Sequence, residues 1–361
     1  MSLLSNLSPN GACNAAHDGA QATDARLILL KDWLVSLNLV DPASARPASA
    51  DASFRRYFRV DVLPAHQPAH GATLIVMDAP PERENVPAFV KVDALFAAAG
   101  VSVPAIVAQD VERGLLLLQD LGVSTYLQVL DHDNASTMYA EALEALVNIQ
   151  KASQPGVLPE FDRAFMLREL NLFPEWYIAK HLGAVLTEAQ AAELQKVFDA
   201  IIANCLAQQQ VYMHRDFHSR NLMWMDEKNP GILDFQDAVY GPITYDVASL
   251  LRDAYISWDE ELVLDWAIRY WQHAKAEGLP VNKDIDSFYK DFEYMALQRH
   301  LKILGIFCRL NYRDGKPLYL GDLPTVLEYV RKTAGRYKDL KPLVRLLDAL
   351  ENKQPQVGYT F

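Results

Sequence analysis

The spacing of apolar residues predicts a sheet in the first third of the chain and helices through most of the remainder. Apolar runs typical of strands lie at residues 72–78, 104–109 and 114–119, and residues 51–60 have the pattern of an amphipathic strand start. Helical spacing precedes these runs over residues 25–37 and separates them over residues 87–99. Residues 41–50, rich in Ala, Pro and Ser, are expected to form a loop. The first third therefore predicts a small sheet accompanied by two helices.

Beyond residue 126 the pattern is mainly helical. Helical spacing covers residues 135–149, 188–209, 259–276 and 292–310. A capping box at Thr187 to Gln190 marks the start of the second of these helices. Three short apolar runs, at residues 210–213, 222–225 and 231–233, predict buried strands between the helices. The expected fold class is α+β, with a small mainly-β part followed by a larger mainly-α part.

The polar residues between the three short strands have the composition of a phosphoryl-transfer site. Asp216 lies in the loop after the first strand, Asn221 follows five residues later, and Asp234 begins the loop after the third. Phosphoryl transfer needs a carboxylate that orients and deprotonates the attacking hydroxyl, here Asp216. It also needs Mg²⁺, which one carboxylate and one amide oxygen can hold, here Asp234 and Asn221.

The pattern H-x-D-x-x-x-x-N from His214 to Asn221, followed by D-F-Q at Asp234, resembles the catalytic and D-F-G loops of protein kinases. With His218 in a second His position, it is more similar to the aminoglycoside phosphotransferase branch of that superfamily. The resemblance implies a bilobal protein-kinase-like fold that uses ATP. Residues 23–121 would form the nucleotide-covering N-lobe and residues 122–361 the C-lobe. Residues 1–22 are expected to be a disordered extension.

The resemblance places the nucleotide against two segments of the N-lobe. Kinases cover ATP with a glycine-rich hairpin, whereas the corresponding segment here contains Ser53, Phe54, Arg55 and Arg56 and no glycine. The hinge, which contacts adenine through backbone groups, would include Gln119 and Leu121.

One departure from the kinase pattern concerns the phosphates. The strand at residues 73–78 lacks the Lys that holds the α- and β-phosphates in kinases. Either the alignment is shifted or another cation replaces this Lys. The nearest candidates are Arg55, Arg56 and Arg59, and Lys91 is a weaker one.

The segment after Asp234 indicates a small acceptor. Only eleven residues separate Asp234 from Asp246, too few for the platform on which protein kinases seat a peptide. No protein substrate is therefore expected. Asp246 is expected to cap or brace the catalytic loop.

Residues that could contact the acceptor are harder to identify. Arg299, Lys302 and Arg309 share one stripe of the helix at 292–310, with His300 beside it. This stripe is either a basic solvent-exposed edge or an anion and acceptor site, because the C-terminal helices wall the acceptor pocket in this superfamily. Glu169 lies in a segment, residues 168–177, whose charges and aromatic rings suit a sugar and suit packing of the large lobe equally well.

Four segments together look like bacterial cell-wall sugar kinases, the anomeric kinases of N-acetylmuramate and N-acetylglucosamine in peptidoglycan recycling. They are residues 51–59, 172–176, 231–238 and 297–307, and the resemblance covers about residues 25–350. It implies an amino-sugar acceptor, a sugar 1-phosphate product and acceptor contacts from Glu169, Arg299, His300 and Arg309. The motif spacing alone supports only a small-molecule kinase. Alternatives are a kinase of another small alcohol or an aminoglycoside, and a pseudokinase that only binds a ligand.

The composition limits the possible binding partners of the protein and its cellular compartment. The net charge of −12 is spread along the chain, which argues against a nucleic-acid-binding surface. Cys13, Cys205 and Cys308 lie far apart and are expected to be reduced thiols. No run reaches the roughly 18 apolar residues of a membrane span, and the first residues lack the features of a signal peptide. The expected location is the cytoplasm.

Overall fold

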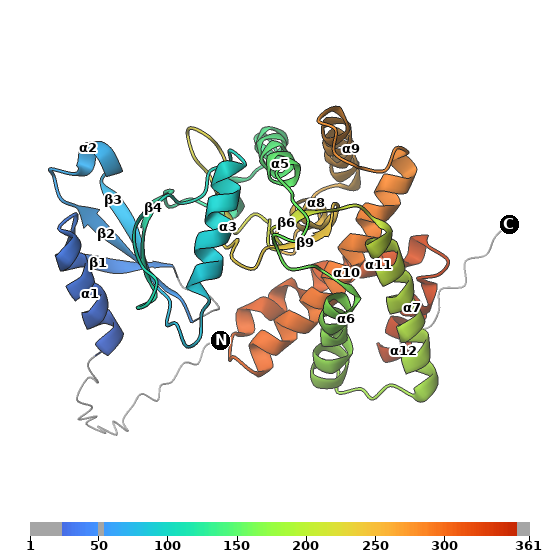
Figure 1. Ribbon diagram of the computed structural model, residues 1–361. Helices are drawn as coiled ribbons and strands as arrows, with labels where there is room; N and C mark the ends of the chain where they lie inside the picture. Colours follow the sequence, from blue (N-terminus) through green and yellow to red (C-terminus); the bar gives the residue numbers. More distant parts are fainter. Residues whose placement is uncertain (1–23, 50–53, 352–361) are drawn as a thin grey trace, which may run out of the picture.

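The computed structural model describes residues 24–49 and 54–351, which form two lobes (Figure 1). The small lobe contains an antiparallel sheet with the strand order β1-β2-β3-β5-β4. Its strands are β1 (Val40–Ser49), β2 (Arg56–Val62), β3 (Thr73–Asp78), β4 (Ile106–Asp110) and β5 (Leu115–Gln119). Its helices are α1 (Ala25–Leu37), α2 (Gln67–His70) and α3 (Val86–Ala98).

The sheet is covered on both faces, and β5 shows how its sequence permits this. Side chains alternate between the two faces of a strand, so four consecutive leucines supply two residues to each face. Leu115 and Leu117 belong to an outer core with α1, whereas Leu116 and Leu118 belong to the main core with α3. Helix α3 therefore joins the sheet to the rest of the molecule, as Figure 1 shows.

The expected loop at residues 41–50 was wrong, because most of it forms β1. This strand pairs antiparallel with β2, and its register is interrupted twice. It is an edge strand, so the missing N–H groups of Pro42 and Pro47 do not break a sheet interior. Composition alone suggested a loop, whereas pairing with β2 decided the structure.

The large lobe is mainly helical, as predicted. Its helices are α4 (Tyr126–Val129), α5 (Ala135–Lys151), α6 (Arg163–Leu172), the π-helix η1 (Phe173–His181), α7 (Glu188–Ala207), α8 (Tyr245–Leu251), α9 (Glu260–Ala276), α10 (Ile285–Tyr312), the 3₁₀ helix η2 (Pro317–Asp322), α11 (Leu323–Arg336) and α12 (Lys341–Leu350). The predicted capping box is present at the start of α7. Within the described residues, no helix is both long and apolar enough to cross a bilayer.

Two short ladders position the loops that carry the motif. Strand β6 (Gln210–Met213) pairs with β9 (Val239–Pro242), and β7 (Leu222–Met223) pairs with β8 (Gly231–Ile232). The catalytic loop, residues 214–221, runs from β6 to β7, and the loop that begins at Asp234 follows β8. Isolated bridges from Ser102 to Gly231 and from Thr125 to Met223 tie these ladders to the chain around the lobe junction. Strands β6, β7 and β8 were predicted at the correct places, although β7 and β8 are shorter than expected, whereas β9 was not predicted.

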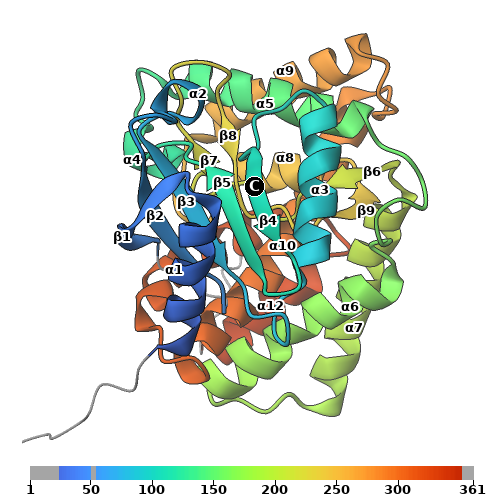
Figure 2. The same cartoon turned by 60° about the vertical axis from the view of Figure 1, so that its left-hand side comes forward.

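Helix α10 runs through the middle of the large lobe (Figures 1 and 2). It begins seven residues before the predicted helix and packs against α6, η1, α8 and α11. Gly305 permits the approach to α6, because a Cβ atom there would lie 2.3 Å from the carbonyl oxygen of Leu172. A backbone atom cannot move aside as a flexible side chain can.

We expect Gly305→Ala to lower the free energy of unfolding by about 1–3 kcal/mol, since the added methyl group overpacks a backbone contact. Chemical denaturation should be compared with Gly335→Ala in α11, where an added Cβ meets nothing within 4 Å. This control should stabilise the protein by up to about 1 kcal/mol, because Ala favours a helix over Gly. Equal effects of the two substitutions would show that the α10–α6 contact tolerates a side chain.

Candidate active site

The catalytic loop is attached to the Asp234 loop through a buried histidine. The Nε2 atom of His214 lies 2.9 Å from the carbonyl oxygen of Leu233, and its Nδ1 atom lies 3.2 Å from the amide nitrogen of Asp216. Because a carbonyl can only accept, Nε2 carries the proton and Nδ1 accepts from Asp216. Burial lowers the pKa of His214 to about 4, so the ring is neutral near pH 7. His214 thereby fixes the backbone on both sides of the site.

Arg215 adopts a left-handed backbone conformation, with φ of 81°, that contacts on every side stabilise. Asp246 accepts hydrogen bonds from the amides of His214 (2.6 Å) and Arg215 (2.9 Å). Arg299 donates to the carbonyl oxygen of Arg215 at 2.7 Å, and Glu169 accepts from its guanidinium at 2.7 Å. Left-handed backbone costs a non-glycine residue about 1–2 kcal/mol, so it persists only where such contacts impose it. The expectation that Asp246 braces the catalytic loop is confirmed.

Glu169 is the centre of a buried charge cluster beneath this loop. Besides Arg215, it lies 3.2 Å from Lys302 and accepts from Gln298 at 3.0 Å. Burial alone would raise the pKa of Glu169, but the charges of Lys302 and Arg215 hold it below its usual value. Lys302 also donates to the hydroxyl of Tyr245. The carboxylate therefore compensates two buried cations at once.

The predicted basic stripe of α10 does not form a solvent-exposed edge. Arg299 and Lys302 are 4% and 6% exposed and point into the cluster under the catalytic loop. His300 is not brought to this loop. It contacts the Arg252 carbonyl oxygen and stacks on Tyr329 instead.

Arg309 lies two turns beyond Lys302 and is half-buried. Burial and the neighbouring charge of Arg313 lower the pKa of its guanidinium.

The charges around Asp216 favour the ionised form of its carboxyl group. Burial would raise the pKa of its carboxyl group, but the charge of Lys302, together with the other cations beneath the loop, lowers it well below the usual range. The side chain is partly exposed at the surface of the loop. Near pH 7 it can accept a hydrogen bond from a hydroxyl group but cannot donate one.

The side chains of Asn221 and Asp234 lie side by side. The Asn221 side-chain amide donates to the carbonyl oxygen of Asp216 at 3.0 Å and lies 3.4 Å from Oδ2 of Asp234. This use of its nitrogen leaves Oδ1 available as an acceptor. Asp234, with φ of 62°, also accepts from Gln236 at 2.9 Å. In the described part of the chain, no three His, Cys, Asp or Glu side chains form a metal-binding group. One carboxylate and one amide oxygen fit Mg²⁺, which takes its other ligands from water and phosphate.

The segment expected to cover the nucleotide, residues 51–59, is called the cover segment here. Arg55 is the arginine of this segment that reaches Asp234. Its guanidinium lies 3.2 Å from Asp234 and 3.7 Å from Glu84, which precedes α3, and the residue is 9% exposed. Phe54 donates its amide to the same Glu84 carboxylate, while its ring is exposed. Ser53 lies outside the described residues.

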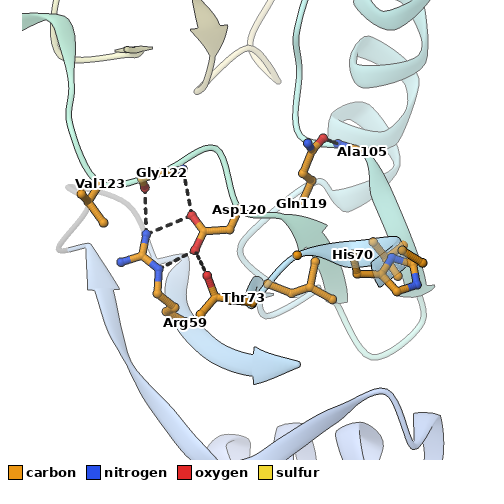
Figure 3. A pocket seen from close by; sticks show the side chains of 13 residues that line it. Arg59, His70, Thr73, Ala105, Gln119, Asp120, Gly122 and Val123 are labelled. Atoms are coloured by element: carbon orange, nitrogen blue, oxygen red, sulfur yellow. Dashed lines mark hydrogen bonds and ion pairs between the residues drawn. The ribbon is translucent and has the colours of Figure 1, made fainter. Parts of the chain in front are cut away.

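Arg56 and Arg59 are bound by other carboxylates. Arg56 pairs with Asp78 at the end of β3, on the α1 side of the sheet. Arg59 pairs with Asp120, which also accepts from the hydroxyl of Thr73. These last three residues line a pocket of about 670 Å³ at the end of the sheet (Figure 3). The pocket is lined by Gln119 of the predicted hinge but by none of Asp216, Asn221 or Asp234, so it is separate from the predicted catalytic residues. Lys91 donates to the carbonyl oxygen of Val157.

The predicted hinge residues differ in how their backbones are used. The amide of Gln119 donates to Ala105 and so belongs to the sheet, while its side chain is exposed. Leu121 is buried beside Gly231, and its backbone forms no hydrogen bond with any other described residue.

Sequence reasoning missed Asp253. This carboxylate, 3% exposed, accepts from the amide (3.0 Å) and hydroxyl (2.5 Å) of Ser219 and from the amide of Tyr255 (3.0 Å). It braces the second half of the catalytic loop as Asp246 braces the first. The only signal was a second acidic residue seven positions after Asp246, and a surface aspartate would give the same pattern.

Comparisons with known proteins agree with this geometry. The model of the phosphotransferase enzyme family matches residues 44–279. The chain is 47% identical to an N-acetylmuramate/N-acetylglucosamine kinase of Neisseria meningitidis serogroup B, over 93% of this chain and 99% of that protein. It is 46% identical to a Pseudomonas putida protein of the same name, over 86% and 90%.

Solved structures show the same fold at much lower identity. A choline kinase from Cryptosporidium parvum superposes with a TM-score of 0.58 at 12% identity, covering 89% of this chain and 98% of that one. An ADP-bound aminoglycoside phosphotransferase superposes with a TM-score of 0.54 at 13% identity, covering 85% and 97%. The bilobal protein-kinase-like fold predicted from the sequence is confirmed.

Proposed function

The chain belongs to the phosphotransferase enzyme family, and from this premise we propose that it phosphorylates the anomeric hydroxyl of N-acetylmuramate and N-acetylglucosamine with ATP. The observation that carries the proposal is the placement of Asp216 beside Asn221, whose side-chain amide donates both to the carbonyl oxygen of Asp216 and to the carboxylate of Asp234. The names of the two bacterial relatives support the amino-sugar acceptor. The product would be a sugar 1-phosphate, and the role would lie in peptidoglycan recycling.

Asp216 is the residue that acts on the acceptor. Its carboxylate accepts the hydrogen bond of the sugar hydroxyl and so aims the oxygen at the phosphorus. Its low pKa makes it a weak base, which suits a proton taken late in a loose transition state. An anomeric hydroxyl is more acidic than an ordinary alcohol, so a weak base is adequate.

Asn221 and Asp234 are the proposed Mg²⁺ ligands, through the amide oxygen and the carboxylate. Bound Mg²⁺ would neutralise charge on the phosphates. His214 keeps the two ligands in register with Asp216, because it bonds to the backbone of both loops.

We assign the phosphate contact of the missing strand Lys to Arg55, supported by its approach to Asp234. The remaining nucleotide contacts are proposed for Ser53 and Phe54 of the cover segment, and for Gln119 and Leu121 at the hinge. Arg56 is not proposed as a contact, because it is held by Asp78 and by Asp24 at the start of α1. The lobes would divide between residues 121 and 122. The need for ATP favours a cytoplasmic location.

The function is tested by incubating the purified protein with Mg·ATP and each sugar, and by recording ³¹P NMR spectra of the products. A phosphate coupled to H1 is expected for both sugars. A 6-phosphate, or turnover of neither sugar, would overturn the proposed reaction.

We expect Asp216→Asn to lower turnover by about 100-fold or more, the usual contribution of a positioned base. Nucleotide binding, measured by calorimetry, should persist, because Asp216 faces the acceptor. Asp234→Ala should abolish Mg²⁺-dependent nucleotide binding as well. Near-native turnover of Asp216→Asn would contradict the assignment of the base.

We expect Arg55→Ala to raise the KM for ATP and to lower turnover, since phosphate charge is stabilised mainly in the transition state. Arg56→Ala and Arg59→Ala serve as matched controls, because Asp78 and Asp120 already neutralise these two side chains. Kinetics at varied ATP concentration distinguish the three variants. Three equally mild variants would reject a phosphate contact from the cover segment.

A further inference from the structure

Arg220 differs from the other cations at the catalytic loop. Arg215 is paired with Glu169, and Arg299 and Lys302 are buried beneath the loop. Arg220, four residues after Asp216, is exposed. Within residues 24–49 and 54–351, it forms no hydrogen bond or ion pair with any carboxylate.

Two aromatic rings hold the Arg220 side chain in place. Its Cζ atom lies 3.6 Å from the ring centroid of Tyr255 and 5.7 Å from that of Tyr319 in η2. Stacking on a ring uses the face of a guanidinium and leaves the N–H groups at its edge available. The charge is therefore held in a restricted position, and its hydrogen-bond donors are not used by any of the residues that the structure describes.

The backbone beneath Arg220 is fixed as well. Asp253 binds both Ser219, the residue before Arg220, and Tyr255, the ring on which Arg220 stacks. A single buried carboxylate thus sets the position of the arginine relative to its aromatic support. Such prior ordering reduces the entropy lost when a ligand binds.

His218 relates this cation to the catalytic carboxylate. Its ring packs edge-to-face on Tyr255 at 5.4 Å. Its amide donates to the carbonyl oxygen of Asp216 at 3.0 Å, and Arg220 stacks on the same Tyr255 ring. A sugar whose hydroxyl meets Asp216 would therefore extend beside His218 toward Arg220.

We propose that Arg220 binds the lactyl carboxylate of N-acetylmuramate and sets the preference between the two acceptors. The inference rests on the proposed function and deepens it. A planar guanidinium matches a carboxylate with two parallel hydrogen bonds, and N-acetylglucosamine offers no such group. The anion-binding role that sequence analysis considered for the basic stripe of α10 is therefore assigned to Arg220 of the catalytic loop.

The test is the ratio of kcat/KM for the two sugars in Arg220→Gln. This ratio should shift against N-acetylmuramate by about 10- to 100-fold, the effect of losing a hydrogen bond between charged groups. Arg220→Lys should lie between Gln and wild type, because it keeps the charge and loses the planar fork. Arg269→Gln, an exposed arginine of α9 paired with Asp265, is the matched control and should leave the ratio unchanged.

A neutral analogue of N-acetylmuramate tests whether the effect of Arg220→Gln depends on the lactyl carboxylate. Wild type and Arg220→Gln should phosphorylate the lactyl amide of N-acetylmuramate at similar kcat/KM, because the carboxylate is absent. Equal losses on both sugars, no loss on either, or an undiminished effect of Arg220→Gln on the amide would overturn the inference and leave the sugar kinase assignment standing. Failure of the wild type to phosphorylate either sugar would instead overturn the proposed function, and the inference with it.

Discussion

The structure depends on the neutralisation of buried charge around Arg215. A strained residue carries the backbone from β6 into the catalytic loop, and its amide, carbonyl and guanidinium are each held by a different charged side chain. Removing one member would leave a buried charge without compensation, which is far more costly than the net gain from a complete cluster. The contributing residues come from α6, α8 and α10, so the packing of the whole large lobe determines the position of Asp216. The close contact of Gly305 with α6 belongs to the same framework.

This cluster explains which parts of the site could be predicted from the sequence. Asp216, Asn221 and Asp234 were recognisable because their roles require particular residue types at short, fixed spacings along two loops. Arg299 and Lys302 were correctly placed on one stripe of a helix, but periodicity does not show what a stripe faces. Glu169, the partner of Lys302, lies about 130 residues earlier in the chain, and only the fold brings the two together.

The small lobe shows the same limit in another form. Strands with apolar alternation were found, whereas β1 was mistaken for a loop because its stability comes from pairing at a sheet edge. The three cover-segment arginines are equivalent by type. The alternation of β2 places Arg56 and Arg59 on opposite faces of the sheet, and Arg55 precedes the strand. Arg56 and Arg59 are matched with carboxylates of the small lobe itself, while Arg55 extends to Asp234 of the other lobe. Charge pairing over long sequence separations is therefore the information that the sequence lacks.

The central claim is that the buried cations of α10 position the catalytic loop and do not bind the acceptor. The most direct measurement is kcat/KM of Arg299→Met for both sugars, with thermal unfolding to confirm the fold and Arg299→Lys as the conservative variant. The account predicts that turnover falls at least about 10-fold, since small displacements of a reacting group are costly. The ratio between the two sugars should stay at its wild-type value, and Lys should restore part of the loss. A loss confined to N-acetylmuramate, with N-acetylglucosamine phosphorylated at the wild-type rate, would contradict the account.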